Sequence, residues 1–153
     1  MILSIAKHGG CRAVAHYVVR EDAQAEWSAG TITNLNPDKI ARTMESFASL
    51  NESGKLQHKV FHASLSLAPG EHLNGEQWAQ VTEDFTEKMG FEQTAWVAVL
   101  HQDKPEQEHV HIVASRVDVE GRTVRDWKDW ERGEELGRGY EKEYGLRQLP
   151  TRE

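Results

Sequence analysis

The stretch TAWVAVLHQDKPEQEHVHIVASRV, residues 94–117, holds two apolar, β-branched runs on either side of a short polar segment. Runs of this kind predict strands over 94–101 and 109–117. The brief polar connection at 102–108 favours an antiparallel pair, because parallel strands need a longer crossover. We therefore expect these two strands to be neighbours in one sheet.

The rest of the chain alternates between strand and helix patterns. Further strands are predicted over 2–7 and 59–68. Helix patterns run from Cys11 to Arg20, from Asn36-Pro37 onward, from Asn74 to Gly90, and from about Trp130 to Tyr144. The predicted fold class is α/β of the α+β two-layer type, with a central antiparallel-rich β-sheet flanked by helices.

Composition limits the kinds of protein that this chain can be. With 153 residues, of which 38% are hydrophobic, it has enough material for one domain with a real core. It contains neither an apolar run long enough to span a bilayer nor a charged-then-apolar leader. The single cysteine, Cys11, excludes an internal disulfide framework and favours a cytosolic protein. A net charge of −7 argues against a surface that binds nucleic acid throughout.

Three histidines gather at one end of the predicted strand pair. His109 and His111 alternate on a strand, so they point the same way with Cβ atoms roughly 7 Å apart. His101 arrives at the same end from the neighbouring strand, and three imidazoles would leave an ion open to water or substrate, as in catalytic sites. Asp103 is either a further ligand or the acceptor that fixes a histidine tautomer. An isolated H-x-H more often binds nothing, but His101 and Asp103 together favour a metal site.

Two other segments carry candidate functional groups. The strand over 59–68 places His62, Ser64 and Ser66 on one face, which either lines a polar groove or faces solvent. Tyr17 follows His16 shortly after a Gly-Gly break, and a tyrosine in such a helix is by default a packed amphipathic side chain.

These segments, taken in order, resemble the motifs of the plasmid mobilisation relaxases, the MobA-like family of the HUH nuclease superfamily. The resemblance covers nearly the whole chain. It is carried by AKHGGCRAVAHYVVRED (6–22), GTITNL (30–35), VFHASLSLAPGE (60–71), VAVLHQDKPEQEHVHIVASR (97–116) and YEKEYGL (140–146). It implies a single relaxase (HUH endonuclease) domain over 1–153, the N-terminal part of a longer protein.

The resemblance also implies a mechanism. Tyr17 would attack a phosphodiester of single-stranded origin-of-transfer DNA, leaving a 5′-phosphotyrosine link and a free 3′-hydroxyl, and the reverse reaction would rejoin the strand. One divalent ion, Mg²⁺ or Mn²⁺, would polarise the scissile phosphate. Its expected ligands are His101, His109 and His111. Asp103, or alternatively His16, would take the phenolic proton.

Binding of DNA is expected from polar and basic side chains near this site. Ser66, Arg116, Lys7 and Arg12 are the expected contacts with the DNA backbone. A local basic cleft on an acidic body would reconcile the net charge with strand binding. The basic residues expected around it are Lys7, Arg12, Arg20, Lys104, Arg116, Arg122 and Arg125. Ser115 stands where the family often has asparagine.

The implied biological setting is the bacterial cytoplasm, with relaxosome accessory proteins and a coupling protein as partners and no membrane contact. Three alternatives stay open. Rolling-circle replication initiators use tyrosines that follow the histidines, and Tyr140 and Tyr144 share a helix face in this way. The chain can also be a metal-dependent hydrolase with a water nucleophile, or a non-catalytic relaxosome binding module. The opening motif and the closing YGL favour Tyr17.

Overall fold

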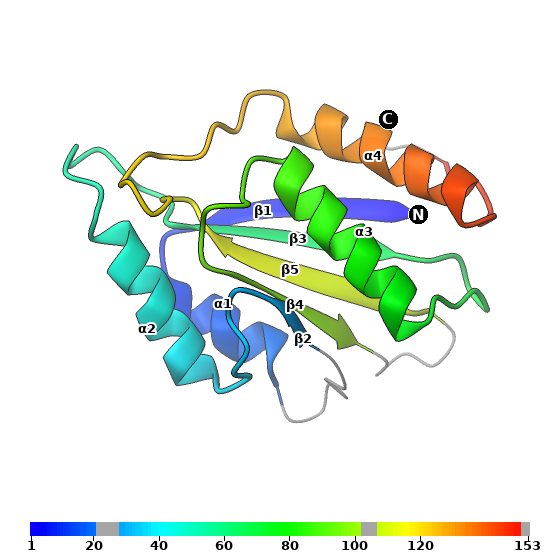
Figure 1. Cartoon of the computed structure of the whole chain (residues 1–153), viewed down its shortest axis with the longest axis horizontal. Helices are drawn as coiled ribbons and strands as arrows, with labels where there is room; N and C mark the ends of the chain where they lie inside the picture. Colours follow the sequence, from blue (N-terminus) through cyan, green and yellow to red (C-terminus); the bar gives the residue numbers. More distant parts are fainter. Residues whose placement is uncertain (21–27, 102–106, 151–153) are drawn as a thin grey trace.

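The computed structural model describes residues 1–20, 28–101 and 107–150. It contains a five-stranded sheet and helices on both sides of it (Figure 1). The elements are β1 (Ile2–His8), α1 (Cys11–Val18), β2 (Ser28–Gly30), α2 (Pro37–Ala48), β3 (Val60–Ser66), α3 (Gly75–Lys88), β4 (Trp96–His101), β5 (His109–Ser115) and α4 (Asp129–Glu143). Within these ranges, no helix has the length and apolar character needed to cross a bilayer.

The strands lie in the order β1-β3-β5-β4-β2, and every neighbouring pair is antiparallel. The predicted pairing of 94–101 with 109–117 is confirmed, because β4 lies beside β5 with His101 directly opposite His109. On its other side β5 pairs with β3, which places Ser64 opposite His111. The sheet thus brings three chain segments together around the histidines.

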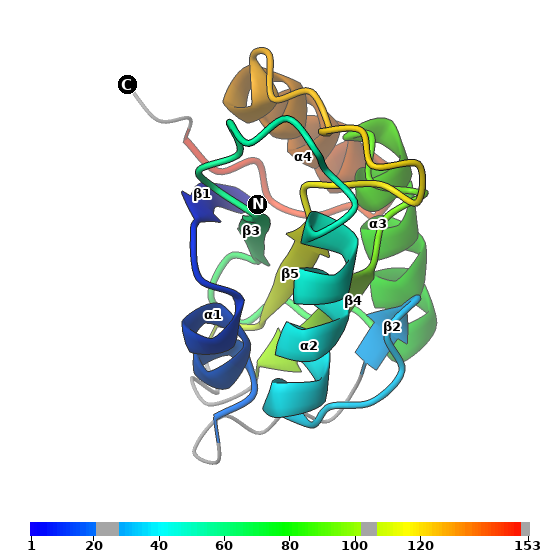
Figure 2. The same ribbon diagram turned by 90° about the vertical axis from the view of Figure 1, so that its left-hand side faces the viewer.

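Helices cover both faces of the sheet (Figure 2). Helices α3 and α4 pack on one face with the larger core, which includes Trp78, Phe85, Phe61 and Ile112. Helices α1 and α2 pack on the other with a smaller core. The predicted antiparallel α+β class is confirmed, but the layers number three rather than two. The reason is that β4 and most of β5 are buried on both sides, so each face needs its own cover.

The starts of α2 and α3 and the end of α3 lie where the sequence predicts them, whereas α1 ends at Val18 and not at Arg20. The side chain of Asn36 accepts hydrogen bonds from the backbone N–H groups of Asp38 and Lys39 at the start of α2. Asn74 and Gln77 form a reciprocal capping box at the start of α3, with bonds of 2.8 and 2.9 Å. Gly90 follows α3 at a φ of 93°, a conformation that glycine adopts without strain.

The short strand β2 was not predicted from the sequence. Its three residues, Ser28–Gly30, show no apolar alternation, and only pairing with β4 makes them a strand. Gly30 has a φ of 114°, and a Cβ atom there would lie 2.4 Å from the carbonyl oxygen of Trp96. A close approach of two backbones therefore requires this glycine.

Candidate metal centre and active site

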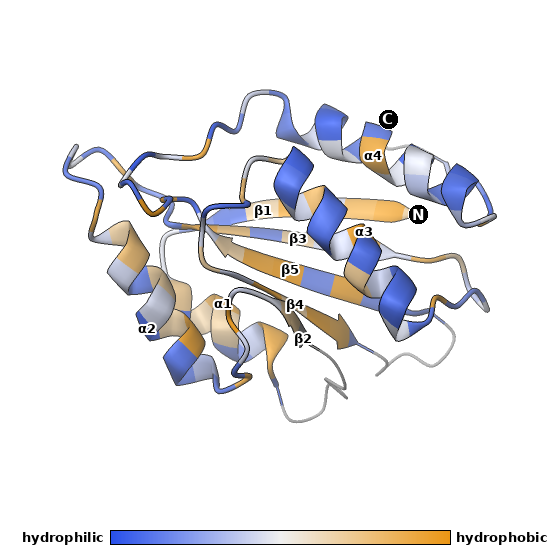
Figure 3. Ribbon diagram, in the orientation of Figure 1, coloured by the Kyte–Doolittle hydropathy of each residue, from blue (hydrophilic) through white to orange (hydrophobic). Residues whose placement is uncertain are grey.

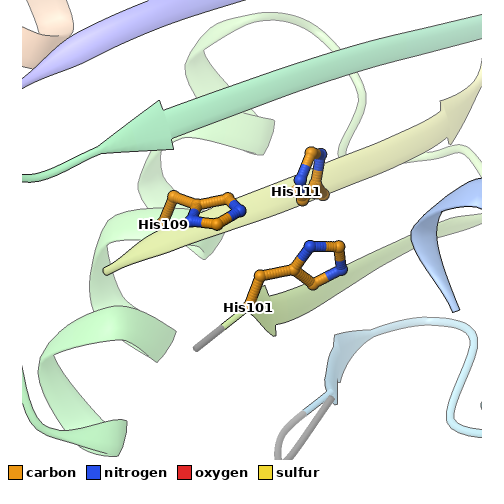
Figure 4. Close-up of side chains that lie close together, drawn as sticks. All are labelled: His101, His109 and His111. Atoms are coloured by element: carbon orange, nitrogen blue, oxygen red, sulfur yellow. The ribbon is translucent and has the colours of Figure 1, made fainter. Parts of the chain in front are cut away.

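The three predicted histidines converge at one end of the sheet. His109 and His111 project from β5 and His101 from the end of β4, and Figure 4 shows their rings facing a common space. One ring nitrogen of each lies within 4.8 Å of the others. His101 is fully buried, His111 is nearly so, and His109 lies at the edge. This spacing allows one ion to contact all three rings, since metal–nitrogen bonds are about 2 Å long.

Backbone carbonyl groups fix the tautomers of two of these rings. The Nε2–H of His101 donates to the carbonyl oxygen of Val18 over 2.6 Å, and the Nδ1–H of His109 donates to that of Gln107 over 3.2 Å. A carbonyl oxygen can only accept, so the lone pair lies on Nδ1 of His101 and on Nε2 of His109. Bonds of this kind orient histidines that ligate metals, and the donor set therefore fits a divalent ion.

The third ring contacts another imidazole instead of a carbonyl group. Nδ1 of His111 lies 2.8 Å from Nε2 of His62, which projects from β3. Burial, followed by the neighbouring histidines His8 and His101, lowers the pKa of His62 to about 4. Burial, with the same kind of neighbours, lowers the pKa of His111 to about 2. Both rings are therefore neutral at physiological pH, which is the form that binds metal.

Tyr17 lies over this pair of rings. Its centroid is 5.9 Å from that of His111 and 6.1 Å from that of His62, and both contacts are edge-on. The guanidinium carbon of Arg20 is 5.1 Å from the Tyr17 centroid. The side chain is 52% exposed, in contrast to the packed tyrosine that is the default expectation for such a helix. Its neighbour Val18 is fully buried, so α1 is held down while Tyr17 faces the site.

A hollow of about 380 Å³ adjoins the ring of Tyr17 on the β1 side. Its lining is mostly apolar, and His8, His62 and Ser4 add polar groups. The lining residues are Ser4, Ala6, His8, Ala13, Val14, Tyr17 and His62. Tyr17 and His62 therefore both border this hollow.

Two of the four predicted DNA contacts lie on the face of the histidines. Ser66 is directly opposite His109 in the register of β3 and β5, so both side chains point to the same side. Arg12 lies on α1, its side chain is 78% exposed, and its Nε is 3.3 Å from a carboxylate oxygen of Asp38.

The other two predicted contacts are not brought to the site. Lys7 points to the opposite face of the sheet, where its ammonium group is 3.1 Å from Asp126 and 2.9 Å from Asp129. Arg116 follows the far end of β5 and is only 9% exposed, and its guanidinium donates to the carbonyl oxygens of His58 and Val124. The sequence gives no sign of this, because it shows neither the face nor the partner of a charged side chain.

Among the residues that the structure describes, the expected basic cleft is supported only near α1. Arg12 and Arg20 lie on the side of the histidines, whereas Arg122 pairs with Asp118 and Glu120. Arg125 stacks on Trp127. Lys104, like the predicted catalytic Asp103, falls outside the described residues. Ser115 is buried and donates its hydroxyl to the Val117 carbonyl, so it does not face the site.

The alternative base, His16, points toward α2. Its Nε2 lies 2.9 Å from an Oδ1 atom of Asp38, beside the guanidinium group of Arg12. This contact joins His16 to α2, although the residue is next to Tyr17 in the chain.

Glu108 is a further residue that sequence patterns do not single out. Its buried carboxylate accepts from the indole N–H of Trp78 and the backbone N–H of Leu73, and it lies 3.1 Å from Nδ1 of His72. Because Glu108 directly precedes His109, these bonds anchor the start of β5 to the segment before α3.

The two tyrosines near the C-terminal end lie on the other side of the sheet. Tyr140, only 4% exposed, donates its hydroxyl to Asp84 on α3 over 2.7 Å, and burial raises its pKa. Tyr144 donates to Gln80 on the same helix, and burial with nearby Glu143 and Asp84 raises its pKa. Both therefore pack α4 against α3.

The antiparallel sheet carries an H-x-H pair on a central strand, a third histidine beside it and a tyrosine above, which is the arrangement expected from the resemblance to the HUH nucleases. The family model for MobA/VirD2-like relaxases, nuclease domain, matches residues 17–146, so the chain belongs to this family of plasmid-transfer relaxases. It is accordingly a DNA-nicking enzyme.

A solved structure described as "Molecular Basis of Vancomycin Resistance Transfer in Staphylococcus aureus" is similar in fold, with a TM-score of 0.59 and 11% sequence identity. The match covers 97% of this chain and 96% of that one. At this identity the likeness concerns the fold alone. Among curated protein sequences, none matches the chain.

Proposed function

We propose that this relaxase nicks single-stranded origin-of-transfer DNA with Tyr17 as the nucleophile and rejoins the strand by the reverse reaction. The observation that carries the proposal is the position of the Tyr17 ring, about 6 Å from the rings of His111 and His62 and half exposed. A phosphodiester entering above the histidines would meet the phenol on the same side.

The chemistry conserves the number of phosphoester bonds. The Tyr17 oxygen forms a bond to phosphorus while the bond from phosphorus to the 3′-oxygen breaks. The phenolic proton passes to a base, and the 3′-oxygen takes up a proton as it leaves. Reversal needs no further energy source, because a phenol is a better leaving group than an aliphatic alcohol.

His101, His109 and His111 would hold one divalent ion, Mg²⁺ or Mn²⁺, through one ring nitrogen each, and the carbonyl bonds define the lone pairs of His101 and His109. When bound, such an ion withdraws charge from the non-bridging oxygens of a phosphate. The chain's own contribution is to keep three ring nitrogens close together in a partly buried site, which the carbonyl bonds of His101 and His109 support.

Asp103 is the proposed proton acceptor, since it follows His101 by two residues. His16 is the weaker candidate, because its ring is bonded to Asp38 on α2. A carboxylate at this position can accept the phenolic proton.

The DNA strand is proposed to cross the face of the sheet from the hollow beside Tyr17 to the end of β3. The apolar lining of the hollow and its imidazole rings suit an unstacked base, and Ser66 and Arg12 would contact the backbone. Lys7 and Arg116 are left out of this path because both are bonded elsewhere in the protein. Relaxosome accessory proteins and a coupling protein are the proposed partners in the bacterial cytoplasm.

The decisive experiment traps the covalent intermediate. The chain is incubated with Mn²⁺ and a pool of randomised, 3′-labelled single-stranded oligonucleotides, and adducts are isolated under denaturing conditions. We expect label on the protein, with the phosphate mapped to the peptide that contains Tyr17. Label on the peptide with Tyr140 and Tyr144 would indicate a replication initiator, and strand cleavage without an adduct would indicate a water nucleophile. DNA binding with no cleavage would indicate a binding module.

A further inference from the structure

The three clustered histidines differ in what holds them. His101 and His109 each donate a ring N–H to a backbone carbonyl group, which a side-chain substitution elsewhere cannot remove. Nδ1 of His111 lies instead 2.8 Å from a side-chain atom, Nε2 of His62. The orientation of the His111 ring therefore depends on which residue stands at position 62 as well as on the backbone.

A hydrogen bond between two neutral imidazoles needs one N–H group and one lone pair. If His62 donates from Nε2, the proton of His111 must lie on its own Nε2, which then cannot bind an ion. If His111 donates from Nδ1, its Nε2 carries the lone pair. Only the second arrangement gives the cluster three donors, and it requires His62 to accept.

The sheet places His62 where it can accept. In the register of β3 and β5, Ser64 is directly opposite His111, and His62 lies two residues before Ser64 on the same face of β3. The ring of His62 therefore reaches His111 diagonally, and the two centroids are 5.0 Å apart. The ring of Tyr17 lies edge-on to both, so Tyr17, His62 and His111 contact one another in a triangle.

We propose that His62 is a positioning residue that accepts the Nδ1–H of His111 and so directs the Nε2 lone pair of His111 toward the rings of His101 and His109. This role rests on the metal site of the proposed function. It assigns to His62 the task that the carbonyl groups of Val18 and Gln107 perform for the other two histidines. His62 contributes to nicking through His111 and does not itself bind the ion.

The test compares two substitutions of His62 in the whole chain. His62→Gln places an amide oxygen acceptor near the former Nε2 position, whereas His62→Phe keeps a planar ring without an acceptor. Ser64→Ala, on the same face of β3 and opposite His111, is the matched control. Mn²⁺ affinity is measured by titration calorimetry, and the melting temperature of each variant reports whether it is folded.

We expect His62→Phe to weaken Mn²⁺ binding by about 10- to 100-fold, the usual effect of losing a partner of a metal-bound histidine. His62→Gln and Ser64→Ala should bind within a few-fold of the unsubstituted chain. Equal affinity in all folded variants, or an equal loss in His62→Gln and His62→Phe, would overturn the role of His62 as the acceptor.

A second measurement is independent of metal and of DNA. The ¹⁵N shifts of the histidine side chains report which ring nitrogen carries the proton, and His111 can be assigned by its loss in His111→Asn. We expect the Nδ1–H form of His111 in the unsubstituted chain and in His62→Gln, and the Nε2–H form to gain population in His62→Phe. An Nε2–H form of His111 in the unsubstituted chain contradicts the proposal.

The two measurements separate the possible failures. An unsubstituted chain that binds no Mn²⁺ would overturn the metal site and, with it, this role of His62. Normal Mn²⁺ binding with unchanged tautomers in His62→Phe would overturn the role of His62 alone.

Discussion

The two faces of the central sheet differ sharply, although the same strands form both. Toward α3 and α4, β5 presents Val110, Ile112 and Ala114, all almost inaccessible to solvent. Toward the side of α1, the same strand presents His109 and His111. Figure 3 shows this alternation as hydrophilic and hydrophobic segments within β5. One strand therefore serves the main core and the histidine cluster with alternate residues.

Packing of the apolar face fixes the positions of the histidines on the polar face. A slip of β5 by one residue would turn His109 and His111 into the core and Val110 and Ile112 out of it. Burial of these apolar side chains opposes the slip, and it thereby keeps His101 opposite His109 and Ser64 opposite His111. The positions of the histidines thus depend on the core behind them as much as on their own bonds.

The tyrosines show the same contrast. Tyr17 is 52% exposed on the histidine side, whereas Tyr140 is 4% exposed on the other and donates its hydroxyl to Asp84. A nucleophile must be reachable by its substrate, but a packing side chain need not be. The two faces therefore predict opposite consequences for the same substitution of tyrosine by phenylalanine.

The largest expected effect is the loss of the covalent adduct in Tyr17→Phe. The substitution removes one oxygen atom, so the fold and Mn²⁺ binding should persist while the adduct and the nick disappear. Tyr140→Phe and Tyr144→Phe are the matched controls and should keep the adduct. Denaturing gels of protein incubated with 3′-labelled single-stranded DNA measure this, and an undiminished adduct in Tyr17→Phe would refute the assignment.

The next effect concerns the histidines of β5. His109→Ala combined with His111→Ala removes two of three proposed ligands, and nicking should fall on the order of 100-fold or more. Mn²⁺ binding measured by calorimetry should be lost in parallel, with little change in melting temperature, because these side chains contribute little to the main core. Nicking at the normal rate by the double variant is the result that would exclude the metal site.

A substitution on the opposite face of the same strand should have the reverse effect. Ile112→Ala deletes a buried side chain next to the histidines in sequence, and it should lower the free energy of unfolding by about 2–5 kcal/mol. Mn²⁺ affinity, measured well below the melting temperature, should change much less. Loss of metal binding in a folded Ile112→Ala variant would mean that the two faces are not separable in this way.

Local patterns in the sequence predict a large part of the fold and of the histidine site. The alternation in 94–101 and 109–117 predicts β4, β5 and the meeting of their histidines, and Asn36 and Asn74 predict the starts of two helices. These features depend on residues close together in the chain, whose spacing can be read directly.

The features that the sequence does not predict depend on long-range pairing. The position of β3 beside β5 brings His62 to His111, and the position of β2 beside β4 makes a strand of three small residues. Lys7 belongs to the other face because of the register of β1 with β3, and its acidic partners come from a segment more than a hundred residues later. No periodicity within one segment encodes such partners.

The smallest expected effect compares two basic residues that were both predicted to bind DNA. Arg12 is exposed on the side of Tyr17, whereas Lys7 is bonded to Asp126 and Asp129 on the opposite face. Arg12→Ala should weaken single-stranded DNA binding a few-fold and reduce the salt dependence by about 0.7, the value for one phosphate contact. Lys7→Ala should leave both quantities unchanged, since its ammonium group lies on the opposite face of the sheet and is engaged there by two carboxylates. Fluorescence anisotropy with a labelled oligonucleotide at several salt concentrations measures both variants. Weaker binding in Lys7→Ala than in Arg12→Ala would mean that the strand extends around the sheet edge to the face of α4, and the division between the two faces would then fail for DNA binding.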